Sequence, residues 1–170
     1  MVYTVPGIKL GARGEKPTDT MKRLPPRYQQ LANEVSQRLP PRWLACELEG
    51  DAPSVEWEIE LTEDVHLTQS GCVVVASAAA ERFETVECWT VTLHRRVLDQ
   101  LSDQAVRWVI ARELGYVAAC RASGIVVSPE SDPSGPASIR AACERRADLY
   151  AIDWGFSEER KAYDREVSLL

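Results

Sequence analysis

Apolar residues recur at intervals of three and four positions after Pro26, and this spacing predicts an amphipathic helix. The members of its apolar stripe are Tyr28, Leu31, Val35 and Leu39. Pro40 and Pro41 end the helix, because proline lacks the amide hydrogen needed to continue it. Residues 1–24 show no such period and are rich in Gly, Pro, Lys and Thr. We therefore predict an extended N-terminal arm over residues 1–24, followed by one domain over residues 25–170.

Four segments after this helix have the composition of β-strands, namely residues 43–49, 54–61, 72–78 and 85–93. In the second segment, apolar residues alternate with glutamates from Val55 to Leu61. This alternation is typical of a strand with one buried side and one side facing solvent. We predict that the segments form a small, mostly antiparallel sheet.

The hydrophobic period returns to that of a helix after Asp99. Three helices are predicted here, over residues 103–121, over 138–153 and from 157 onward. Ser102 and Ser138 are suited to cap the first two helices, and Gly155 is suited to close the second. A loop rich in Pro, Ser and Gly, residues 128–138, leads into the second helix. The order of helix, sheet and three helices predicts an α+β fold, with the sheet packed against the later helices.

The chain has 170 residues and a formal net charge of -6. A chain of this size can form a core without disulfides or metals. The acidic balance argues against nucleic-acid binding, which draws its affinity from clustered Lys and Arg. The N-terminus lacks the pattern of a signal peptide, and no apolar run is long enough to span a bilayer. We expect a cytoplasmic protein that binds neither nucleic acid nor a membrane.

The cysteines are odd in number, scattered, and free of any C-x-x-C pair, so we expect buried, reduced thiols. They are Cys46, Cys72, Cys88, Cys120 and Cys143. The two histidines, His66 and His94, do not accompany a cysteine in any nucleophile pattern. His94 follows a strand-like run, which indicates a structural histidine.

Two of the predicted helices carry a pattern with chemical meaning. The segment IARELGYVAA contains Arg112, Glu113 and Tyr116, and the segment CERRADLYAIDWGF contains Glu144 and Asp148. Together they resemble the zincin metallopeptidases of the gluzincin type, in particular the small minigluzincins. That family carries H-E-L-G-H on one helix and E-x-x-A-D on the next, packed against a small sheet. The resemblance covers residues 84–160 by motif and the earlier elements by their order.

In that family two histidines and a glutamate of the second helix bind zinc, and the glutamate between the histidines is the general base. The resemblance places Arg112 and Tyr116 at the histidines, Glu113 at the base, Glu144 at the third ligand and Asp148 at a supporting acid. Arginine has no lone pair to donate, and tyrosine binds a metal only as a phenolate. The resemblance therefore implies a zincin-like fold whose five positions form a pseudo-site, with no metal, no cofactor and no catalytic residue.

The resemblance implies first a catalytically inactive domain that binds a peptide or protein, or has a regulatory role. In zincins an edge strand before the first site helix receives an extended peptide, and the strand from Thr85 to Leu93 stands in that place. One alternative is a metal-dependent peptidase with atypical ligands, or a different hydrolase built on Glu113 and Glu144. The other is a structural, self-associating domain, suggested by five tryptophans.

Positions 112 and 116 are separated by about 40° around a helix, and in the family both face the third ligand. A glutamate at that place without a metal needs a partner, so we predict an ion pair between Arg112 and Glu144, with the Tyr116 hydroxyl as a further donor. Cys120 and Cys143 flank the pseudo-site. No other Cys or His accompanies either of them, so we expect no metal there.

Overall fold

The structure is a computed structural model that describes residues 24–41, 43, 54–64, 74–82, 86–125 and 137–168. The elements in this part of the chain are α1 (Pro26–Arg38), β1 (Ser54–Thr62), β2 (Ala76–Arg82), β3 (Val86–His94), α2 (Arg95–Leu98), α3 (Asp103–Ala122), α4 (Ala137–Asp153) and α5 (Ser157–Val167). Helices and a small sheet together confirm the predicted α+β class.

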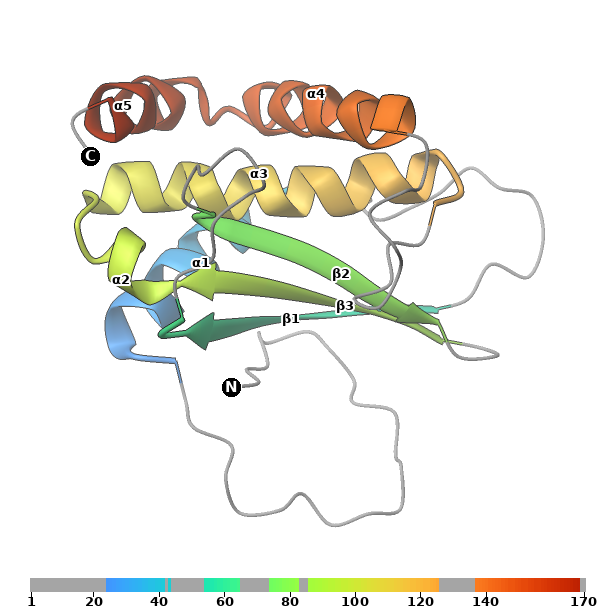
Figure 1. Cartoon of the computed structure of the whole chain (residues 1–170), viewed down its shortest axis with the longest axis horizontal. Helices are drawn as coiled ribbons and strands as arrows, with labels where there is room; N and C mark the ends of the chain where they lie inside the picture. The colour runs from blue at the N-terminus through green and yellow to red at the C-terminus, as the bar shows by residue number, and fades with distance from the viewer. Residues whose placement is uncertain are drawn as a thin grey trace, which may run out of the picture.

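The long helix α3 lies at the centre of the molecule, between the sheet on one side and α4 and α5 on the other (Figure 1). The first helix, α1, also packs against α3. The sequence of α3 is apolar around most of its circumference, and the helix is accordingly buried on nearly all sides. Side chains on α3 can therefore contact every layer of the fold.

The sheet is mixed, with the strand order β1-β3-β2. β1 pairs with β3 in parallel, and β2 pairs with β3 in antiparallel orientation. The predicted antiparallel pairing therefore holds for only one of the two strand pairs. Each strand reverses the direction of the one before it, so β3 runs in the same direction as β1. β3 lies between β1 and β2 in the sheet, so it is parallel to β1 and antiparallel to β2.

The central position of β3 contradicts the predicted peptide-binding edge between Thr85 and Leu93. Every residue from Val86 to His94 is paired with β1, and the residues from Glu87 to Leu93 are also paired with β2. Strand addition requires an open side of a strand, and strands occupy both sides of β3. The order along the chain does not show this, because pairing across the sheet decides which strand lies at the edge.

The predicted strands over residues 54–61 and 85–93 match β1 and β3 closely. β2 runs from Ala76 to Arg82, further along the chain than the predicted segment 72–78, and its Ala80 pairs with Trp89 of β3. Residues 72 and 73 lie outside the described residues. Residues 44–49 of the other predicted strand lie outside the described residues, and so do residues 1–23 of the predicted arm. Leu24, which we assigned to that arm, is buried in the core.

One face of the sheet packs against the helices, and the other face is polar. On the buried face the register pairs Trp57 with Trp89, Ile59 with Val91 and Leu61 with Leu93. On the polar face, the hydroxyl of Thr90 donates a hydrogen bond to Glu58 at 3.1 Å. The alternation of apolar and acidic residues in β1 is therefore confirmed as a two-sided strand.

The helix ends follow local rules, with one exception. The Ser102 hydroxyl accepts a hydrogen bond from the backbone N–H of Ala105 at 3.2 Å, so the predicted N-cap of α3 is confirmed. Gly155 closes α4 with a φ of 90°, the left-handed conformation that glycine adopts most readily. The predicted cap at Ser138 is wrong, because α4 begins at Ala137 and Ser138 lies inside the helix.

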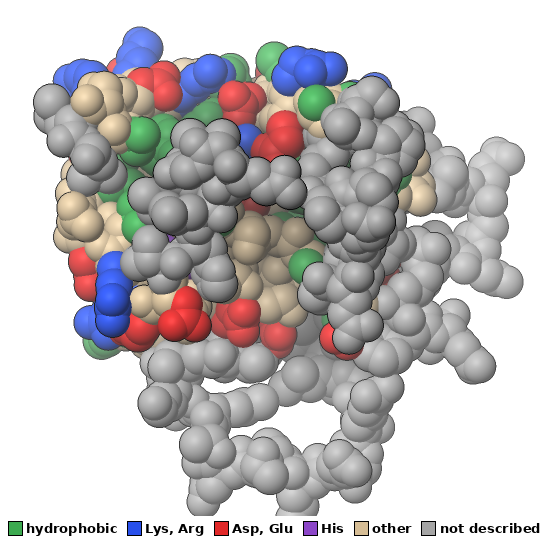
Figure 2. Space-filling model, viewed as in Figure 1, with side chains coloured by type: hydrophobic (Ala, Val, Ile, Leu, Met, Phe, Trp, Pro, Cys, Tyr) green, Lys and Arg blue, Asp and Glu red, His purple; other side chains and the backbone are tan. Residues whose placement is uncertain are grey.

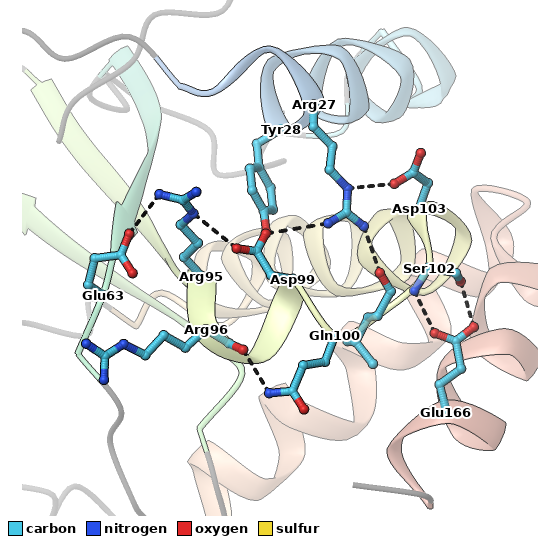
Figure 3. Close-up of polar contacts among 11 residues, drawn as sticks. Arg27, Tyr28, Glu63, Arg95, Arg96, Asp99, Gln100, Ser102, Asp103 and Glu166 are labelled. Atoms are coloured by element: carbon cyan, nitrogen blue, oxygen red, sulfur yellow. Dashed lines mark hydrogen bonds and ion pairs between the residues drawn. The ribbon is translucent and has the colours of Figure 1, made fainter.

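Polar contacts join α1 and α5 to the start of α3 (Figure 3). The Tyr28 hydroxyl donates a hydrogen bond to Asp99 at 2.7 Å, and Arg27 approaches the same carboxylate at 3.6 Å. Ser102 donates to Glu166 of α5 through its backbone N–H at 2.7 Å and its hydroxyl at 2.6 Å. These hydrogen bonds lower the pKa of Glu166, so the carboxylate stays charged beside the N-terminus of α3.

Acidic and basic side chains are interspersed along the edge of the molecule formed by α4 and α5 (Figure 2). A mixture of both signs is typical of solvated helix faces. Within the described residues, no helix is long and apolar enough to cross a membrane.

α3 and α4 approach each other closely at Gly115. A Cβ atom at this position would lie 2.6 Å from the backbone oxygen of Ala147. A glycine here has no side chain, so the backbone of α4 can come this near. The contact aligns the two helices that carry the motif residues.

Gly115→Ala tests this packing, because alanine is normally better than glycine in a helix by up to about 1 kcal/mol. At position 115 the added methyl group meets backbone that cannot rotate away. We expect the free energy of unfolding to fall by about 1–3 kcal/mol, measured by urea denaturation. Ala141→Gly, at an exposed position inside α4, reports the ordinary difference between the two residues. A Gly115→Ala chain as stable as wild type would contradict the close approach.

Candidate functional site

The predicted pseudo-site residues of α3 and α4 meet around the side chain of Arg112. Its guanidinium donates from Nε to Asp148 at 2.9 Å, from Nη1 to Glu113 at 3.0 Å, and from Nη2 to Glu144. Each nitrogen of the guanidinium thus binds a different carboxylate. We call these four residues the Arg112 cluster. The predicted ion pair between Arg112 and Glu144 is present.

Helical spacing explains why these side chains face one another. Arg112 lies one turn before Gly115 on α3, and Asp148 follows Ala147 directly on α4. The two helices are antiparallel (Figure 1), with Arg112 of α3 near Asp148 and Gly115 near Ala147. The close approach at Gly115 therefore brings the guanidinium within reach of acids on α4.

The three carboxylates of the cluster differ in exposure. The side chain of Glu113 is 8% exposed, that of Asp148 is 31% exposed, and that of Glu144 is 43% exposed. Burial raises the pKa of Glu113 to about 7, although Arg112 opposes this shift, and the nearby charge of Glu144 adds to it. Glu113 therefore takes up a proton at a higher pH than an exposed glutamate does.

Arg112 remains a cation under all ordinary conditions. Burial disfavours its charged form, but the three carboxylates outweigh burial and raise its pKa above the usual value. A protonated guanidinium has donors only and offers no lone pair to a metal ion.

Helix α5 adds two residues to the surroundings of the cluster that sequence reasoning missed. Arg160 approaches Oδ2 of Asp148 at 3.6 Å, whereas Arg112 binds Oδ1 of the same carboxylate. Burial raises the pKa of Tyr163, and the charges of Arg112 and Glu113 are near enough to influence it. Arg160 and Tyr163 are three residues apart, so the sequence indicates that they share one face of α5. The sequence does not indicate that this face lies near Arg112.

Tyr116, the second histidine position of the motif, is buried in α3. Its hydroxyl is a hydrogen-bond partner of the Cys120 thiol, one turn further along the helix. The hydrogen bond that we predict from Tyr116 to Glu144 stays a prediction.

The residues of the Arg112 cluster do not fit a zinc ion. The guanidinium repels a cation, and the remaining donors are carboxylate oxygens that do not select zinc. Among the described residues, no three His, Cys, Asp or Glu side chains are arranged to hold a metal ion. His94 lies at the end of β3, buried, with Nδ1 2.9 Å from the backbone oxygen of Asp64. His66 lies outside the described residues.

Comparison of the chain with family models, with curated proteins and with solved structures finds no match. The interpretation of the site therefore depends on its geometry and on the resemblance of its motif.

Arg112→Ala should leave the buried carboxylate of Glu113 without its cation. We expect the free energy of unfolding at pH 8 to fall by about 2–3 kcal/mol. Arg95→Ala is the control, because Arg95 also binds more than one acid, Glu63 at 2.9 Å and Asp99 at 3.2 Å, but does so at the surface. Exposed ion pairs contribute far less, so the control should lose little stability. Equal losses in the two variants would show that the cluster is an ordinary surface ion pair.

The raised pKa of Glu113 predicts a stability that depends on pH. The folded chain holds this proton more tightly than the unfolded chain, whose glutamate has a pKa of about 4.5. The resulting stabilisation is full below a pH of about 4.5 and is lost as the pH rises through about 7. Glu113→Gln stays neutral, so between pH 5 and pH 8 wild type should lose roughly 1–3 kcal/mol of unfolding free energy relative to this variant. A constant difference over this range would contradict the assignment.

Proposed function

We propose that this chain is a catalytically inactive zincin-like domain that acts by binding a peptide or protein partner. The observation that carries the proposal is the guanidinium of Arg112, which binds Glu113 and Glu144 at the same time. These are the residues that the motif resemblance assigns to the general base and to the third metal ligand. At the positions that the resemblance assigns to the zinc site, the chain thus carries a cation of its own.

The arrangement of the elements supports the proposal. The helix with the RELGY segment and the helix with the second motif are antiparallel, in contact, and directed at one another through their motif residues. A three-stranded sheet precedes them and packs on the first of these helices. Fold and motif together do not provide catalysis, because activation of water in this family requires the metal.

The alternative of a hydrolase built on Glu113 and Glu144 is less well supported. A general base needs a free lone pair and a route to the substrate. Glu113 is almost fully buried, and its carboxylate is bound by Arg112.

We assign peptide binding to β2 in place of the central strand β3. Among the described strands, β1 and β2 are the outer ones, and β2 is the outer strand that contacts α3 (Figure 1). An extended peptide adds to an outer strand through backbone hydrogen bonds. A peptide bound along β2 would therefore lie beside the helix that carries Arg112.

The tryptophans give less support to self-association. Trp43 packs edge-on against Trp57 and Trp154, each at 5.8 Å between ring centroids, and Trp154 stacks on Tyr150 at 5.7 Å. Three of the five tryptophans thus pack against one another within one chain. Such contacts stabilise the fold and require no second copy.

Metal content and peptide cleavage test the proposal together. After dialysis, wild type should hold far less than one equivalent of zinc, and peptides retained by the immobilised chain should be recovered intact. Arg112→His combined with Tyr116→His restores both histidines beside Glu144 and should gain zinc binding. The single variant Arg112→His is the control and should bind zinc at least tenfold more weakly than the double variant. One equivalent of zinc in wild type, with cleavage abolished by a chelator, would overturn the proposal.

A further inference from the structure

Two cysteines from different helices lie against each other in the interior of the molecule. Cys120 is on α3 and Cys143 is on α4, and both side chains are buried. The thiol of Cys143 is a hydrogen-bond partner of the thiol of Cys120. Their positions in the sequence place both cysteines beside the pseudo-site, but they do not predict that the two thiols touch.

The packing of the helices places the two cysteines at the same level of the helix pair. α3 and α4 are antiparallel and come close at Gly115 and Ala147. Cys143 lies one turn before Ala147 on α4, and Cys120 lies just over one turn beyond Gly115 on α3. Both steps lead in the same direction along the helix pair, so the two residues lie at a similar height, and their thiols are in contact there.

We propose that Cys120 and Cys143 form a disulfide between α3 and α4 when the chain reacts with a low-molecular-weight disulfide. One thiol, as its thiolate, attacks a sulfur of the small disulfide and releases one small thiol. The second cysteine then attacks the mixed disulfide and releases the other small thiol. The two cysteines are oxidised, the small disulfide is reduced to two thiols, and the cysteine protons pass to these products.

The other cysteines do not compete for this pair in the described part of the chain. Cys88 is on β3, on the face of the sheet opposite to Trp89, and is separated from the helix interface by the sheet itself. Cys46 and Cys72 lie outside the described residues.

The environment of the thiols predicts a slow reaction that depends on opening of the helix pair. Burial raises the pKa of Cys120 to about 12, with a further contribution from Cys143. The thiol is therefore protonated while α3 and α4 are packed, and oxidation requires a transient separation of the helices. Once formed, the bond would fix α4 on α3 immediately beside Glu144, which follows Cys143 in the chain.

Peptide mapping tests the proposal on the intact chain. Wild type is incubated with oxidised glutathione at neutral pH, the remaining thiols are alkylated, and the chain is digested with trypsin. Trypsin releases residues 113–121 and 141–145, each of which contains one cysteine. We expect these two peptides to be joined, with a mass two hydrogens below their sum, and to separate on reduction. The midpoint of thermal unfolding should rise by roughly 5–10 °C in the oxidised chain.

The variants are chosen so that the result does not depend on one substitution. Cys88→Ser should form the same linked peptides, whereas Cys143→Ser should leave Cys120 alkylated or joined to glutathione. If Cys143→Ser does not fold, the peptide map of wild type decides alone. Oxidation of other cysteines while peptides 113–121 and 141–145 remain separate would overturn the proposal, and so would stable glutathione adducts at both positions.

Discussion

The close approach of α3 and α4 at Gly115 is the contact on which the rest of the described structure depends. With no side chain at this position, the backbone oxygen of Ala147 can lie 2.6 Å from the place that a Cβ atom would occupy. The residues on either side of the contact then meet across the helix pair. Arg112 reaches the acids of α4 on one side, and Cys120 reaches Cys143 on the other. Both pairs therefore lie along the interface in which this close approach occurs.

The single cation of the Arg112 cluster offsets part of the negative charge of its three acids. Burying a carboxylate is costly unless a cation and hydrogen bonds compensate for the lost water. One planar guanidinium does this for three acids, because its three nitrogens point in different directions. Compensation is least complete for Glu113, the most buried of the acids, whose pKa is raised in spite of its contact with Arg112. Such a network specifies how two helices fit together, and it is consistent with the proposed inactive domain.

The strand order changes where a partner could bind. Motif order along the chain favours the strand next to α3 in sequence, but β3 lies between β1 and β2 and uses both of its sides for pairing. The outer strand β2 contacts α3 instead. The proposed peptide site therefore moves to β2, by an argument that depends on hydrogen bonding across the sheet and not on distance along the chain.

The sequence by itself determined those features that depend on neighbouring residues. The stripe of α1, the alternation in β1 and the cap at Ser102 follow from local periodicity and local hydrogen bonds, and all of them are found. The motif also predicted the contact between Arg112 and Glu144, because helical spacing fixes which side chains share a face. Only the tertiary structure decided the central place of β3, the approach of Arg160 from α5 and the meeting of the two buried cysteines. These features join residues that are distant in the chain, and their partners are selected by packing and pairing, which no local pattern records.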